Sequence, residues 1–187
     1  MKWQPTAFDN ANVQCGQMWS GDETWSSTLA TIVDEYENAF VASLLYDEQT
    51  SYDLNLNNVA GAHIGYSGVK AETGTGMEFK WVNDEFSATY THWFYGEPDT
   101  VRLPPGAKAC VYMNRDALWR TDWNCITPLP FVCKAVPPNA YIVPDDRGTI
   151  LPCNETHGWY STQTHEEQGY YCMKAMTDEV SFYEGSN

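Results

Sequence analysis

Six cysteines constrain this chain more than any other feature of its sequence. They are Cys15, Cys110, Cys125, Cys133, Cys153 and Cys172. An even number of cysteines in a chain of this size indicates a disulfide framework, which persists in an oxidising compartment. We therefore expect a secreted, extracellular protein; the alternative is a reduced cytosolic protein with buried thiols. Spacing alone does not choose among the many possible pairings.

The composition is that of a folded and strongly acidic protein. Of the 187 residues, 43% are apolar and 14% aromatic, enough to bury a core. The formal net charge of −15 argues against binding nucleic acid, because phosphate recognition needs cationic side chains. No apolar run approaches the length of a membrane span, about 18 residues, and Met1–Pro5 lacks the apolar stretch of a secretory signal. The sequon that begins at Asn154 predicts a glycosylation site, which fits an extracellular protein.

A proline-rich seam divides the chain. Pro137 and Pro138 are adjacent, and Pro144 follows shortly after them. Because such segments are typical of linkers, we predict one domain over residues 1–134 and a C-terminal extension over residues 135–187.

The periodicity predicts two helices and then short strands. Thr6 with Asp9, and Asp34 with Glu37, have the spacing of capping boxes at helix starts. Beyond the polar loop at residues 51–58, short apolar runs lie between glycines. The predicted strands span residues 62–66, 79–82, 109–114 and 129–134. This order predicts an α+β fold with helices packed against antiparallel sheet.

Several segments, taken together and in order, resemble the C-type lectin-like domain. They cover about residues 3–134 and match that family's "AxxxC", "LAxI", "WIGL", "FxW", "NWxxGEPN", strand-cysteine, "DxxC" and "FVCK" elements. In this chain they begin at Ala11, Leu29, His63, Phe79, His92, Cys110, Asp122 and Phe131. The resemblance implies the C-type lectin-like fold: two helices, small antiparallel sheets and a long loop region. His63 stands where tryptophan is usual, and we expect it, with Trp81 and Trp93, to face the core.

The resemblance also implies the disulfide pairing. The cysteine of the first helix would join the last strand as Cys15–Cys133, and the inner bond would be Cys110–Cys125. Cys153–Cys172 remains for the extension and would give it a disulfide of its own. Together with His157 and His165 these two cysteines form an alternative zinc set, but their spacing matches no common zinc pattern.

A calcium and carbohydrate site is implied at the Glu-Pro-Asp segment. Calcium prefers carboxylate and carbonyl oxygens, and in calcium-binding family members a cis proline separates two of the ligands. The resemblance therefore implies Glu97, Asp99 and Asp122 as metal ligands, with Thr121 joining them in binding carbohydrate. Aromatic side chains nearby, Trp93, Tyr95 and Trp123, offer stacking surfaces as an alternative to packing in the core.

Two departures weaken the calcium prediction. Thr121 replaces an asparagine ligand, and Lys108 replaces a glutamate. An ammonium repels a cation, so Lys108 would instead act as a built-in cation that neutralises the three carboxylates, assisted by Arg102 and Arg120.

The sequence thus predicts a secreted recognition protein that binds carbohydrate with calcium. The alternative is a calcium-independent interaction protein, a subunit of an extracellular assembly. The expected partner is a glycan or an extracellular protein, and an oligomer is possible. No set of residues in the sequence indicates catalysis, and we expect no enzyme activity.

Overall fold

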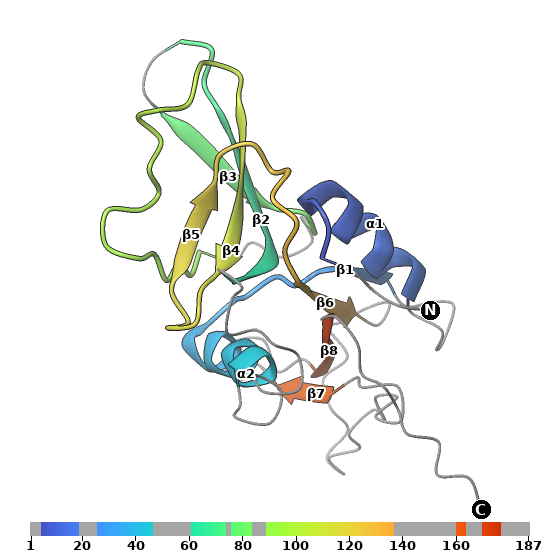
Figure 1. Cartoon of the computed structure of the whole chain (residues 1–187). Helices are drawn as coiled ribbons and strands as arrows, with labels where there is room; N and C mark the ends of the chain where they lie inside the picture. The colour runs from blue at the N-terminus through green and yellow to red at the C-terminus, as the bar shows by residue number, and fades with distance from the viewer. Residues whose placement is uncertain are drawn as a thin grey trace, which may run out of the picture.

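The computed structural model describes residues 5–18, 26–46, 61–73, 76–83, 89–136, 160–163 and 170–176. Two helices in this part of the chain, α1 (Phe8–Met18) and α2 (Glu35–Tyr46), lie beside a twisted sheet (Figure 1). Neither helix has the length and apolar character needed to cross a membrane.

The two predicted helix starts have different outcomes. At α2 the capping box is present, because Asp34 Oδ1 accepts a hydrogen bond of 2.7 Å from the Glu37 amide. At α1 the predicted box at Thr6 is wrong. The Ala7 carbonyl accepts the first helical hydrogen bond, from Ala11. Thr6 instead forms an antiparallel bridge with Leu129, so the chain is still extended where the helix was expected to begin.

Eight strands of the described residues form one sheet. They are β1 (Ser26–Leu29), β2 (Ala62–Lys70), β3 (Met77–Trp81), β4 (Lys108–Met113), β5 (Trp119–Asp122), β6 (Phe131–Val136), β7 (Tyr160–Gln163) and β8 (Tyr170–Met176). Their order in the sheet is β5-β4-β2-β6-β8-β7, with β1 paired to β6 and β3 paired to β2. All four predicted strands are present, and β1 and β5 are additions within residues 1–134. The ends agree to within two residues, except that β2 continues to Lys70, beyond the predicted end at residue 66.

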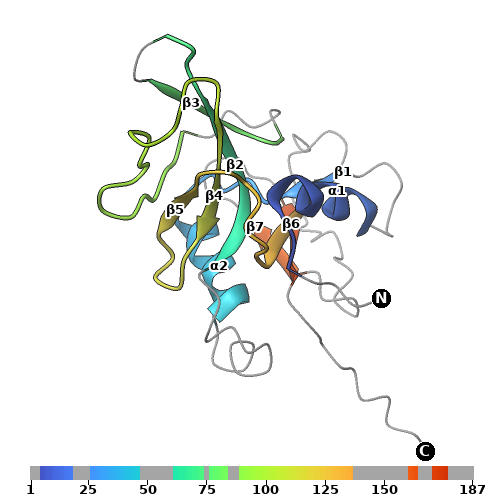
Figure 2. The same cartoon turned by 45° about the horizontal axis from the view of Figure 1, so that its top comes forward.

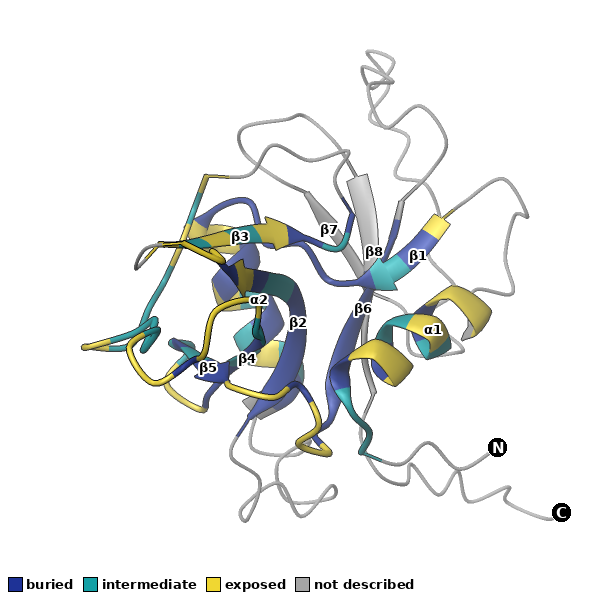
Figure 3. Ribbon diagram, turned by 90° about the horizontal axis from the view of Figure 1, so that it is seen from above, coloured by how far each residue is buried: buried dark blue, intermediate teal, exposed yellow. Residues whose placement is uncertain are grey.

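Two buried clusters hold the sheet between the helices. One lies under α1 and contains Phe8 with four cysteines. The other is aromatic and aliphatic, and its residues include Trp81, Trp119 and Val132. The strands β2 and β6 are buried along most of their length, whereas the outer face of α1 is exposed (Figure 3).

Two disulfides close the domain as the resemblance implied. Cys15 on α1 is bonded to Cys133 on β6, and Cys110 on β4 is bonded to Cys125. These bonds span 118 and 15 residues, so loop-closure entropy gives about 4–5 and about 3 kcal/mol respectively. The predicted Cys153–Cys172 bond and Asn154 lie outside what the structure describes.

A buried ion pair connects α2 to β6. The Lys134 ammonium lies 2.6 Å from Oε1 of Glu37, and the two side chains are only 1% and 0% exposed. Glu37 Oε2 also accepts a hydrogen bond of 2.8 Å from the Val33 amide. Burial raises the pKa of Glu37 above its ordinary value of 4.5, although Lys134 acts in the opposite direction.

The C-terminal strands belong to the same sheet. β8 pairs antiparallel with β6 in a register that places Ala135 opposite Cys172, and β7 pairs with β8. Met173 of β8 is fully buried in the aromatic and aliphatic cluster. Backbone hydrogen bonds therefore continue across the predicted boundary at residue 134.

Candidate ligand-binding site

Residues 89–107, which lead into β4, form a long loop at one edge of the sheet. They extend on the side of β4 and β5 that lies away from α1 (Figures 1 and 2). Two backbone hydrogen bonds attach the loop to the start of β5: Phe94 donates to the Trp119 carbonyl and Trp119 donates to the His92 carbonyl. Trp93 packs against the aromatic cluster, as the resemblance implied.

The loop turns at Glu97–Pro98, whose peptide bond is cis. After this turn, Oε2 of Glu97 accepts three hydrogen bonds. They come from the Asp99 amide at 2.9 Å, the Thr121 hydroxyl at 2.5 Å and the Thr121 amide at 3.3 Å. The structure thus brings together Glu97, Asp99 and Thr121, three of the four predicted site residues.

Asp99 and Trp123 are joined through Arg102. The Arg102 guanidinium lies 3.7 Å from Oδ2 of Asp99 and 5.1 Å above the Trp123 ring. The Arg102 side chain is 70% exposed and Trp123 is 39% exposed, so this arrangement faces solvent. Tyr95 on the same loop is 96% exposed. A carboxylate, a cation and an aromatic ring are thus presented side by side.

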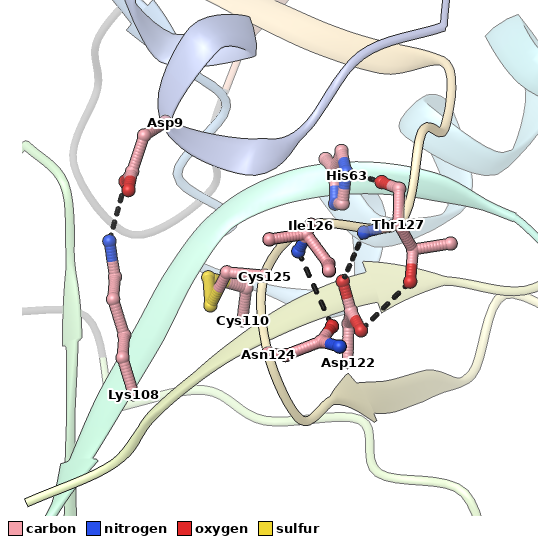
Figure 4. Close-up of a disulfide and its surroundings, with 9 residues drawn as sticks. All are labelled: Asp9, His63, Lys108, Cys110, Asp122, Asn124, Cys125, Ile126 and Thr127. Atoms are coloured by element: carbon pink, nitrogen blue, oxygen red, sulfur yellow. Dashed lines mark hydrogen bonds and ion pairs between the residues drawn. A yellow bond between two sulfur atoms is a disulfide. The ribbon is translucent and has the colours of Figure 1, made fainter.

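Asp122 does not join this group. Its two oxygens accept hydrogen bonds of 2.9 and 3.2 Å from the Thr127 hydroxyl and amide (Figure 4). The reason is the strand pleat, because consecutive residues of β5 face opposite sides of the sheet. Asp122 is paired with Cys110 and points to the side of that disulfide, whereas Thr121 points to Glu97.

Lys108 does not neutralise the predicted carboxylates, and that hypothesis is wrong. Its ammonium lies 2.5 Å from Oδ1 of Asp9 at the start of α1 (Figure 4). Because Lys108 is two residues before Cys110 on the same strand, both side chains face α1. Arg120, which was expected to assist Lys108, instead stacks its guanidinium 3.6 Å from the centre of the Phe94 ring. Of the three cations considered, Arg102 is the one that contacts a site carboxylate.

His63 lies beside the Asp122 contact. It is fully buried, as expected, and its Nε2 is 3.1 Å from the Thr127 carbonyl (Figure 4). Burial lowers the pKa of His63 below 6.5, against the opposing effects of that carbonyl and the Asp122 charge. His63 therefore belongs to the packing beneath the site.

The predicted calcium ligands are not gathered around one point in the described part of the chain. Calcium requires six to eight oxygen ligands around one point. The described ranges contain no group of three or more histidine, cysteine, aspartate or glutamate side chains placed to hold a metal. Oε2 of Glu97 is engaged by Thr121 and both oxygens of Asp122 by Thr127, on opposite faces of β5. The calcium set of Glu97, Asp99 and Asp122 stays a prediction.

Comparison with known proteins identifies a family. Residues 4–135 match the family model described as the lectin C-type domain. Among solved structures, CEL-IV is 23% identical over 70% of this chain and 81% of its own, with a TM-score of 0.48. The C-type lectin CEL-I from Cucumaria echinata is 21% identical over 70% of this chain and 84% of its own, also with a TM-score of 0.48.

Proposed function

Because the chain belongs to the C-type lectin domain family, we propose that it is an extracellular, non-enzymatic protein that binds carbohydrate at the long loop. Domains of this family generally bind Ca²⁺, and they are typically extracellular. The two disulfides support secretion, since such bonds persist in oxidising compartments.

The contact of Arg102 with both Asp99 and Trp123 carries this proposal. Sugars present hydroxyl groups around a ring that also has an apolar face. Asp99 accepts hydrogen bonds, the Arg102 guanidinium donates them, and Trp123 offers a half-exposed aromatic surface. The hydrogen bonds from Thr121 to Glu97 attach the loop to β5.

We propose that this binding does not require calcium. Oε2 of Glu97 and both oxygens of Asp122 accept hydrogen bonds from threonines of the protein itself. Recognition would then depend on the side chains themselves and on a loop that the protein shapes alone.

A glycan array, followed by calorimetry with and without chelator, tests the proposal. We expect a glycan ligand whose affinity is the same in EDTA and in millimolar Ca²⁺. D99N and W123A should each weaken binding about tenfold, equivalent to about 1.4 kcal/mol. E78Q is the matched control, because Glu78 is an exposed carboxylate on β3 that pairs with Lys80.

Three outcomes would contradict this function. An array with no binding would favour the alternative interaction protein. Binding abolished by EDTA would overturn the calcium-independent form. Equal losses of glycan affinity in E78Q and D99N would show that the glycan does not bind at Asp99.

A further inference from the structure

Lys70, the last residue of β2, places a buried cation under the long loop. The residue is 9% exposed, and its ammonium donates hydrogen bonds to two backbone carbonyls. These belong to Thr100, at 2.9 Å, and Leu103, at 2.5 Å. Leu103 is itself buried, so the contact is sheltered from water.

The backbone of Lys70 holds the other end of the same segment. Its amide donates to the Ala107 carbonyl at 2.9 Å, and its carbonyl accepts from the Gly106 amide at 3.0 Å. Residues 100–107 are thus attached to Lys70 at three carbonyls and one amide. The segment also contains its own turn, in which Ala107 donates to the Pro104 carbonyl.

The chemistry of this contact is that of a cation held by oxygen dipoles. A buried ammonium is costly unless its donors are satisfied, and carbonyl oxygens satisfy two of them here. In return the positive charge stabilises carbonyls that converge on one point. A loop built around a dissolved cation would need the same convergence, but Lys70 supplies its charge through a covalent tether.

We propose that Lys70 is the positioning residue of the binding loop, a built-in cation that fixes residues 100–107 without a bound metal. The segment carries Arg102 and directly follows Asp99, so its shape sets the distance between those groups. The link to ligand binding rests on the proposed function, but the effect on loop structure does not.

Hydrogen exchange measured by mass spectrometry tests the positioning role directly. In K70M, which removes the ammonium donors but keeps an unbranched side chain only one atom shorter, we expect amides in residues 100–107 to exchange at least tenfold faster. Amides of β4 should change little. K70R retains a cationic donor and should restore most of the protection. K80M is the control, because Lys80 is exposed and pairs with Glu78.

A second measurement needs no variant and covers the case in which K70M fails to fold. In the wild-type protein, exchange in residues 100–107 should be the same in EDTA and in millimolar Ca²⁺. Protection that appears only with Ca²⁺ would overturn the proposal, as would wild-type exchange rates in a folded K70M.

Glycan binding separates this proposal from the proposed function. If the loop is Lys70-dependent and a glycan is found, K70M should bind it at least tenfold more weakly, with partial recovery in K70R. Loop protection lost in K70M without any glycan ligand would support Lys70 and refute the lectin function. If K70M binds glycan with wild-type affinity although residues 100–107 exchange faster, the role of Lys70 in ligand binding is overturned.

Discussion

The buried pair of Lys134 and Glu37 yields a sharp stability prediction. The variant K134M removes the ammonium but fills similar space, leaving the Glu37 carboxylate with the Val33 amide and no cation. Removing one partner of a buried pair typically costs about 3–5 kcal/mol. For a chain of this size that corresponds to a fall in melting temperature of about 6–20 °C.

The pH dependence gives this prediction its sign. The folded-state pKa of Glu37 is raised above 4.5, so the folded protein holds a proton there more tightly than the unfolded chain. Such a group contributes stability that is full below the unfolded pKa and is lost as pH rises through the folded pKa. Without Lys134 the pKa rises further. The deficit of K134M should therefore be smallest near pH 4.5 and grow toward neutral pH.

Urea denaturation of wild type and K134M at several pH values measures both effects. The double variant E37Q/K134M should recover more than half of the loss, because it removes both charges of the pair. K80M should change stability by less than about 0.5 kcal/mol, since its ion pair is exposed. A K134M deficit under 1 kcal/mol at pH 7, or one that does not shrink on acidification, would refute the reasoning.

Two further predictions concern the corner beneath the site. Because the pKa of His63 is lowered on folding, its contribution to stability is full above its unfolded pKa of 6.5 and is lost as the pH falls below that value. In H63F the unfolding free energy should therefore change less between pH 7 and pH 5.5 than in the wild-type protein. An unchanged slope would contradict this. Replacing Cys110 and Cys125 together by alanine should lower the unfolding free energy by about 3 kcal/mol in the same assay, because the disulfide closes a loop with a sequence separation of 15 residues. A loss below 1 kcal/mol would show that the loop-entropy argument fails for this bond.

Much of the fold is predictable because its signals are local or come in a fixed order. The box at Asp34 and Glu37 depends on two side chains three residues apart, and the structure forms it. The ordered motifs identify the family and with it both described disulfides. The strand β5 was missed because its sequence, Trp-Arg-Thr-Asp, has little of the apolar character expected of a strand.

The site was harder to predict, since it depends on where side chains point. Thr121 and Asp122 are neighbours in sequence, but the pleat of β5 turns them to opposite faces. Lys108 is directed to Asp9 for the same reason. Lys70 gave no sequence signal, because its partners are backbone carbonyls that any residue would supply.

The pairing of β8 with β6 has a practical consequence for dissecting the protein. A fragment trimmed to the family match would end near residue 135 and strip hydrogen-bond partners from one side of β6. It would also open a void where Met173 sits. An exposed edge strand has unpaired backbone groups that can pair with another chain, so we expect such a fragment to aggregate. Recombinant work on this protein therefore calls for retaining the sequence through residue 176.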